Sequence, residues 1–324
     1  MRFTASPALT QCRKIVFLRA LMKPQLLLKL CTAAIGAMLF QFLSRPALAQ
    51  DQDTVRLPPV TVSETKPPAE ELSEDQPIGP NQQPEWTTRR RFGTTRVYVS
   101  APWQLEFEQW WQGKFPREGK SYHLFQSEVS VGLPYRFQLD FYENVELTQS
   151  RTFQHMGHQV EGRWALADWD KIPLNPTLYG EWKFNDDNPD AYELKLLLGE
   201  GFGPRWHWGF NLFYEQEVGG GRESEMGFSQ ALSYTLLDEK LSAGVEMNLE
   251  RTSGPNLDGN PATEFLIGPS VQWRPTPRTH LDLVPLFGTT HDSPHVEVFI
   301  VFGFDFGPGG NHAGIHAPTS TQSH

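Results

Sequence analysis

Cysteine is nearly absent from this sequence, and its two cysteines, Cys12 and Cys31, both precede residue 50. The rest of the chain therefore has no disulfide, no thiolate nucleophile and no zinc site with cysteine ligands. Basic residues are also scarce there. Seven of the 28 Lys and Arg residues lie in the first 49 positions, which leaves 21 against 38 Asp and Glu, a formal net charge of −17. We expect no nucleic-acid partner, because binding to phosphates requires a basic surface.

The first 49 residues contain no Asp or Glu and have the features of a secretory signal. They carry seven basic residues and an apolar run from Leu26 to Leu43, which Lys29 interrupts. A permanent membrane helix would need about 20 apolar residues in succession, so the run fits that role poorly. The motif Ala-Leu-Ala at 47–49 has the small-x-small pattern of a cleavage site. Residues 1–49 are therefore predicted to be a signal peptide that is cleaved near Ala49.

Aromatic residues are missing from residues 50–85, a stretch that holds seven prolines and many acidic residues. Such a composition buries little apolar surface, so residues 50–95 are predicted to form a disordered, Pro-rich, acidic periplasmic segment. Arg89, Arg90 and Arg91 fit two interpretations, namely contact with anionic lipid headgroups and a solvated run of charge. Residues 307–324 are rich in Gly, Pro, Ser and Thr and are predicted to be a flexible tail.

The central part of the chain, residues 96–306, alternates apolar and polar side chains with a period of two. Phe137, Leu139 and Phe141, for example, alternate with Gln138 and Asp140. This period is typical of strands that have one apolar and one polar face. Twelve segments show it, at approximately 103–112, 122–133, 135–149, 153–167, 177–186, 191–201, 205–217, 223–237, 240–251, 263–274, 279–288 and 295–306.

The length of these segments favours a membrane-spanning barrel over a soluble sandwich. Strands that cross a membrane need about 9–11 residues, whereas strands in globular proteins average about 5–6. An even strand number is also what bacterial single-chain barrels require. We therefore predict an all-β fold, a transmembrane antiparallel up-and-down β-barrel of about twelve strands, located in the cell outer membrane.

Some details of the barrel stay open. Residues 96–100 fit the first strand, a separate short strand or a segment that enters the lumen. The connection at 168–176 is long for a periplasmic turn, and Pro269 and Pro285 each remove a ladder donor, which indicates a bulge or an incorrect register. Aromatic residues near the segment ends predict girdles at the membrane interfaces. They include Trp103, Trp110, Tyr135, Trp164, Trp169, Tyr179, Trp206 and Trp273.

The last segment closes with Val-Phe-Gly-Phe-Asp-Phe at residues 301–306. Through this closing sequence and its short alternating strands, the chain from about Arg96 to Phe306 resembles the outer-membrane transporter proteins grouped with the MetA-type phenol-degradation pathway. The resemblance implies a barrel that passes small, often apolar molecules. It carries no catalytic residue over to this chain.

The predicted polar face is mostly acidic, and we expect it to line the lumen. A ring of carboxylates in a pore attracts cations and repels anions. The same carboxylates would instead fill a closed lumen if they paired with interior bases, and the sequence leaves both outcomes open. The predicted lumen-lining residues are Glu106, Glu108, Glu128, Asp140, Glu146, Glu161, Arg163, Glu181, Lys183, Glu193, Lys195, Glu246, Glu250, Glu264, Asp282 and Glu297.

Two main functions fit this pattern. The first is a passive channel for small solutes with an acidic, cation-favouring lumen. The second is a non-conducting structural or interaction barrel whose residues 50–85 bind a periplasmic partner. An outer-membrane esterase or lipase is a minor alternative that would use a Ser-His pair, such as His123 with Ser127 or His155 with Ser130.

We predict no enzyme activity, no cofactor and no metal site. The histidine pairs 291/295 and 312/316 have the spacing of metal ligands on a helix, but neither stretch has a helical pattern. The remaining expected partners are outer-membrane lipids, the barrel-assembly machinery and small solutes.

Overall fold

The computed structural model describes residues 72–307 except 149, 220–221 and 258–259. These residues belong to one compact unit, Lys66–His324. The predicted signal peptide, residues 50–71 and the tail beyond Gly307 lie outside the described residues. No described helix is long and apolar enough to cross a membrane. The helices are single 3-10 turns, η1 (Ser73–Asp75), η2 (Glu85–Thr87), η3 (Pro134–Arg136) and η4 (Pro255–Leu257).

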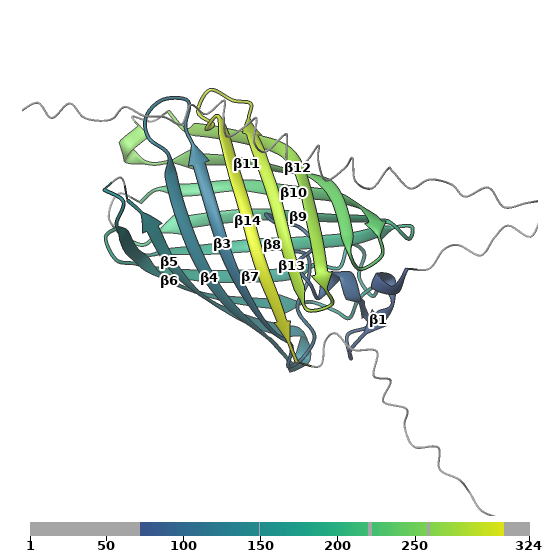
Figure 1. Ribbon diagram of the computed structural model, residues 1–324. Helices are drawn as coiled ribbons and strands as arrows, with labels where there is room; N and C mark the ends of the chain where they lie inside the picture. The colour runs from purple at the N-terminus through teal and green to yellow at the C-terminus, as the bar shows by residue number, and fades with distance from the viewer. Residues whose placement is uncertain (1–71, 149, 220–221, 258–259, 308–324) are drawn as a thin grey trace, which may run out of the picture. The chain divides into compact units, whose positions relative to one another are not determined.

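Twelve antiparallel strands form a closed barrel in which strands that follow each other in sequence pair with each other (Figure 1). The barrel closes between the last strand and the first, where Phe306 pairs with Leu105. The strands are β3 (Leu105–Phe115), β4 (Tyr122–Leu133), β5 (Phe137–Leu147), β6 (Phe153–Ala165), β7 (Thr177–Asn185), β8 (Ala191–Phe202), β9 (Trp206–Glu217), β10 (Ser224–Leu237), β11 (Leu241–Ser253), β12 (Ala262–Thr276), β13 (Thr279–Gly288) and β14 (Val296–Phe306).

The predicted fold and strand number are confirmed. β4 and β13 have the predicted bounds, and every other strand end lies within three residues of its predicted position. The two faces are also as expected. On β5, Phe137 and Phe141 are exposed on the outside, while Gln138 and Asp140 are buried inside. A closed barrel with an apolar exterior has no free sheet edge and pairs its backbone groups between neighbouring strands, which suits a lipid environment.

The two ends of the barrel differ in the length of their connections. The turn end holds the short connections 134–136, 203–205, 238–240 and 277–278, together with the start of β3 and the end of β14. The loop end holds the longer connections such as 218–223, 254–261 and 289–295. Exposed aromatic residues form the expected girdle around the turn end, at Trp103, Tyr135, Trp164, Trp206 and Trp273. The girdle prediction was wrong for Trp110, Trp169 and Tyr179, which lie inside the barrel.

The two prolines in adjacent strands interrupt the ladder without shifting it. β12 and β13 pair at Ile267 with Phe287 and again at Val271 with Leu283, in the same register, and no pairing forms between these points. Pro269 and Pro285 lie in this gap. Each still pairs with the strand on its other side, β11 or β14. The predicted bulge is therefore absent here, since two facing prolines cost the ladder its donors but add no residue.

Residues 72–104, which we call the lumen segment, begin at the turn end, where residues 76–80 are mostly exposed, and residues 83–101 are buried or half-buried inside the barrel. The prediction of disorder was therefore wrong for residues 72–95. Of the three options for residues 96–100, the structure shows the third, a segment that enters the lumen. Both interpretations of the three arginines were wrong as well, because Arg89, Arg90 and Arg91 are buried. A twelve-strand barrel is wider than the side-chain-filled eight-strand kind, so it leaves room for a chain segment.

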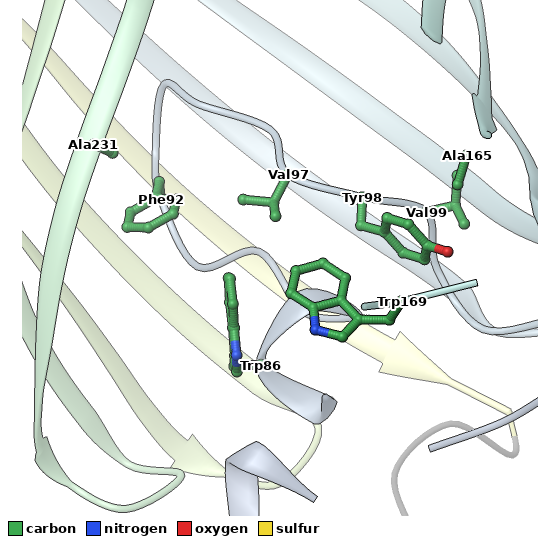
Figure 2. Packing of buried hydrophobic residues seen from close by; sticks show 8 residues of the cluster. All are labelled: Trp86, Phe92, Val97, Tyr98, Val99, Ala165, Trp169 and Ala231. Carbon is green, nitrogen blue, oxygen red and sulfur yellow. The ribbon is translucent and has the colours of Figure 1, made fainter. Parts of the chain in front are cut away.

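Apolar packing holds the lumen segment against the wall (Figure 2). Its side chains Trp86, Phe92, Val97, Tyr98 and Val99 form one buried cluster with residues of the barrel. The barrel contributes Ala165, Ala231 and Trp169.

The long connection between β6 and β7 has its explanation in this packing. Its Trp169 meets Trp86 edge to face, with ring centroids 5.7 Å apart, and meets Tyr98 in the same way at 5.3 Å. Its backbone also accepts a hydrogen bond from the Tyr98 hydroxyl, at Ala167 O. A shorter turn would not reach the lumen segment.

Candidate functional site

The candidate site is the lumen, and its turn-end half is closed by the lumen segment. The segment begins beside the turn between β10 and β11, where the backbone N–H of Ser73 donates to Asp238 Oδ2 over 2.8 Å. Nearby, Asp75 Oδ1 lies 3.1 Å from His207 Nε2 on β9. Burial raises the pKa of Asp75 to about 6 against the attraction of Arg91, and Asp238 adds to the rise. The start of the segment is thus fixed to the wall by polar contacts at Ser73 and at Asp75.

Arg91 links the start of the segment to the wall. Its Nη1 is 2.9 Å from Glu74 Oε2 within the segment, and its Nε donates to Ser233 Oγ on β10 over 3.0 Å. Its Nη2 lies 2.9 Å from His207 Nδ1 and also donates to Thr235 Oγ1. Burial lowers the pKa of Arg91 although Glu74 opposes the change. Satisfying a buried guanidinium takes several partners at once, and here they come from both the segment and the wall.

Two further arginines face two carboxylates in the middle of the barrel. Arg90 Nε donates to Glu108 Oε1 over 2.5 Å, and its Nη2 lies 3.1 Å from Glu128 Oε2. Arg96 Nη2 lies 2.8 Å from both oxygens of Glu128. Glu108 and Glu128 are directly opposite each other on β3 and β4. These facing carboxylates would repel each other. The wall contributes only His280, whose Nε2 lies 3.4 Å from Glu108 Oε1, and the two arginines of the segment supply the remaining positive charge.

Backbone contacts complete the docking. The N–H groups of Gly93 and Thr94 donate to the two carboxylate oxygens of Glu246 on β11, over 3.0 and 2.7 Å. Asn211 on β9 accepts from the Arg96 N–H over 2.8 Å and donates to the Arg96 carbonyl over 2.6 Å. The Asn211 side chain thus satisfies both backbone groups of Arg96, as a neighbouring strand would. This contact fixes the position of the segment along the barrel axis.

Glycines on the inner wall provide the space for the segment. A side chain at Gly199 on β8 would overlap Val97, and one at Gly209 on β9 would crowd Phe92 and Thr95. Gly199 and Gly209 face each other across the two strands. The wall is therefore shaped to the segment as well as charged to match it.

A cavity of about 380 Å³ lies on the loop-end side of the segment. Its floor includes Gly93 and Thr94, and its lining holds six carboxylates and four bases, two of which are Arg90 and Arg96 of the segment. A second pocket of about 180 Å³ lies at the turn end, beside Asp75 and Trp169. Between them is a space of only about 30 Å³, which borders Arg90, Arg96 and Trp86. That is room for one or two water molecules, so a solute would have to move the segment in order to cross.

The structure places the predicted lumen residues on the inner face. Glu161, Glu181, Lys183, Glu193, Lys195 and Glu250 line the large cavity. Glu146 and Glu264 pair across the strands with the cavity-lining residues Leu124 and Glu250.

The other predicted lumen residues are buried beside a partner. Glu108, Glu128 and Glu246 contact the segment, Asp140 lies 2.8 Å from Arg163, and Asp282 lies 2.6 Å from His280, which also neighbours Glu106. Glu297 accepts from Gln112 over 2.5 Å.

Sequence reasoning missed Arg90, Arg96, Glu215 and Glu225 in the cavity lining. Glu215 and Glu225 are directly opposite each other on β9 and β10. The alternation of apolar and polar residues along β9 and β10 could have identified both glutamates as inward-facing. The signal for the arginines was weaker, and consisted only of a basic run beside an acidic lumen.

The two Ser-His pairs of the esterase alternative do not form. His123 lies 3.1 Å from Ser121, while the Ser127 hydroxyl donates to Gln109. His155 is at the loop end beside Glu143 and Asp186, whereas Ser130 is near the turn end of β4.

The chain matches no protein-family model, and no curated protein is similar to it in sequence. Among solved structures, an outer-membrane channel from Pseudomonas putida F1 shares 9% identity at a TM-score of 0.48, over 65% of this chain and 98% of that one. The NanC porin shares 14% identity at 0.44, over 63% and 100%. The KdgM porin in complex with disordered oligogalacturonate shares 11% at 0.41, over 63% and 99%. Likeness at these identities concerns the barrel fold alone, and the resemblance to the MetA-type group is not confirmed.

Proposed function

We propose that the protein is an outer-membrane channel for small polar solutes, and that the lumen segment closes it in the state described here. The observation that carries the proposal is that polar contacts dock the segment on the wall. Ion pairs and hydrogen bonds join the segment to a polar inner wall, so a wall without the segment would be a wetted pore. We assign the turn end to the periplasm because outer-membrane barrels have short turns on that side, and the cavity then opens toward the cell exterior.

An open channel would favour cations. With the segment docked, the cavity holds six carboxylates and four bases. Withdrawal of Arg90 and Arg96 would leave the six carboxylates with only Lys183 and Lys195. A pore with this lining attracts cations and repels anions. It suits polar solutes better than the apolar ones that the family resemblance implied.

A second candidate is a permanently closed barrel with a structural or interaction role. The filled lumen favours it, because the buried arginines and the cluster around Trp86 make docking strong. Residues 72–85 are then docked at the turn end of the barrel, with residues 83–85 buried. A periplasmic partner would be left with residues 50–71, which lie outside the described part of the chain.

A disulfide lock separates the two candidates. Thr95 Oγ1 of the segment lies 3.2 Å from Ser229 Oγ on β10, a separation that a disulfide can close with a small rotation. Both native cysteines precede residue 50, so the double variant Thr95→Cys/Ser229→Cys has no competing thiol in the exported part. We expect the oxidised variant to be silent in planar bilayers and to regain the conductance of the unmodified protein on reduction.

The single variants Thr95→Cys and Ser229→Cys are the controls, since they should conduct alike with and without reductant. Equal conductance of the oxidised and reduced double variant would contradict gating by the segment. Silence of every variant, including the unmodified protein, would favour the permanently closed barrel.

Ion selectivity gives a separate prediction. Glu193 and Glu215 both contact Lys183, over 3.8 and 2.5 Å, at the wall of the cavity. Changing both to glutamine should reduce the preference for cations, because it removes two carboxylates and leaves the lysine uncompensated. Reversal potentials in asymmetric KCl measure this preference. An unchanged reversal potential would show that current does not pass through this cavity.

A further inference from the structure

We infer that the outer wall of the barrel carries a site for a divalent transition-metal ion such as Zn²⁺, built from Glu143, His155 and His158 with Asp186 in support. The site is at the loop end, where β5, β6 and the connection after β7 meet. It is independent of the lumen and of the proposed channel.

The three proposed ligands share the outer face. Tyr142 and Gln159 line the cavity, so their neighbours Glu143 and His158 point outward. One donor atom from each of Glu143, His155 and His158 fits within a cluster of 4.8 Å. Glu143 lies between the two histidines, with Oε1 2.7 Å from His155 Nε2 and Oε2 2.6 Å from His158 Nδ1.

A β-bulge brings the two histidines together. Residues three apart in a regular strand point to opposite faces. The pairing of β5 with β6 shifts by one residue here, since Asn144 pairs with Gly157 but Val145 pairs with His155. Gly157 has φ +139°, and a side chain on it would overlap the backbone of Phe184. The extra residue therefore turns His155 and His158 to the same side, and their ring centroids are 4.8 Å apart. Bulges that re-aim side chains in this way are typical of functional sites.

Asp186 sets the tautomer of His155. The ring Nδ1 lies 2.5 Å from Asp186 Oδ2, and because a carboxylate accepts, Nδ1 carries the proton. In the neutral ring this leaves the lone pair on Nε2. That nitrogen is buried and has no hydrogen-bond partner among the described residues, although Glu143 Oε1 is close to it. A histidine that donates to a carboxylate through one nitrogen and offers the other is the usual arrangement of metal-binding imidazoles.

Geometry and access suit a small ion. Bond lengths of about 2.0–2.2 Å to zinc place tetrahedral ligand atoms about 3.3 Å apart. The two carboxylate–imidazole separations, 2.7 and 2.6 Å, are shorter than this value, so the side chains must move apart to admit the ion. The side chains of His158 and Glu143 are 59% and 48% exposed, so they are free to do so. Two nitrogens and one carboxylate oxygen leave a fourth position open to water or to another oxygen ligand.

The prediction of no metal site considered only histidines four apart, and this pair is three apart. A second group of three donors, Glu106, Glu108 and His280, lies in the lumen. It is a weaker candidate because Arg90 already supplies a cation to Glu108.

Zinc titration of the full-length folded protein in detergent, stripped beforehand with a chelator, tests the site. Calorimetry should show one Zn²⁺ bound per chain, and Co²⁺ in its place should give the visible absorption of a low-coordinate site. His155→Ala/His158→Ala should abolish both signals, and Glu143→Gln should weaken binding. Asp186→Asn should weaken binding by roughly 10- to 100-fold, as expected for a residue that positions a ligand.

His291→Ala is the matched control, because His291 is also exposed at the loop end and contacts only its neighbour Asp292 among the ion pairs of the described residues. It should bind zinc like the unmodified protein. Heat-modifiable migration on a denaturing gel confirms that each variant is folded. Zinc binding that persists unchanged in His155→Ala/His158→Ala would overturn the assignment, as would a folded protein that takes up no zinc.

Discussion

Changing Arg90 and Arg96 together to glutamine is expected to release the lumen segment and open the barrel. The change leaves Glu108 and Glu128 facing each other, buried and without either arginine, so that His280, 3.4 Å from Glu108, is the one ion-pair partner that the described residues still offer them. Removal of one partner from a buried ion pair costs about 3–5 kcal/mol. Since about 1.4 kcal/mol is a factor of ten, the docking equilibrium should shift by roughly 10²- to 10⁴-fold. The wall of the barrel is untouched, so the fold should survive.

Two measurements follow this release. A single cysteine at position 95 should react faster with a membrane-impermeant maleimide when the segment leaves the lumen. In bilayers, long openings should replace silence or rare openings, and they should prefer cations more strongly because two bases have left the cavity.

Arg89→Gln is the control for this experiment, because Arg89 forms its ion pair with Glu85 inside the segment. It should change labelling and conductance little. Adding Glu108→Gln and Glu128→Gln to the double arginine variant should restore part of the docking, since the uncompensated carboxylates are then gone. If the arginine variant labels and conducts like the unmodified protein, the ion pairs do not hold the segment.

Gly199→Leu is expected to expel the segment by steric overlap without changing any charge. A Cβ at this position of β8 would already overlap Val97 of the segment. Overpacking of this kind costs about 1–3 kcal/mol, and the barrel wall cannot yield easily because Gly199 also pairs with Gly209 on β9. Cysteine labelling at position 95 and bilayer conductance should both rise, in the same direction as for the arginine variant.

Gly201→Leu is the matched control, two residues further along the same strand. A Cβ there would approach nothing closer than Trp206 O, at 4.0 Å. It should therefore leave the segment in place. Equal behaviour of the two glycine variants would show that Gly199 does not shape the lumen for the segment. If both Gly199→Leu and the arginine variant gain conductance, steric overlap and loss of ion pairs each release the segment.

The sequence by itself determined the barrel. Alternation of apolar and polar residues is a local property of each strand, and a closed barrel repeats one rule in every strand, with apolar residues outside and polar residues inside. This is why the bounds of β4 were predictable and why residues such as Asp140 and Glu181 were correctly placed on the inner face. The period of two left no other face for them.

Only the tertiary structure decided what fills the lumen. Local composition made residues 72–95 look disordered, because their partners are distant in sequence. Glu128 is 32 residues from Arg96, and Glu246 is 153 residues from Gly93. The same holds for the cluster on the outer wall, where one extra residue between His155 and His158 reverses the face on which His155 lies. Alternation predicts faces as long as the register is unbroken, but it contains no information about a bulge or about which segment of the chain enters the space that a barrel encloses.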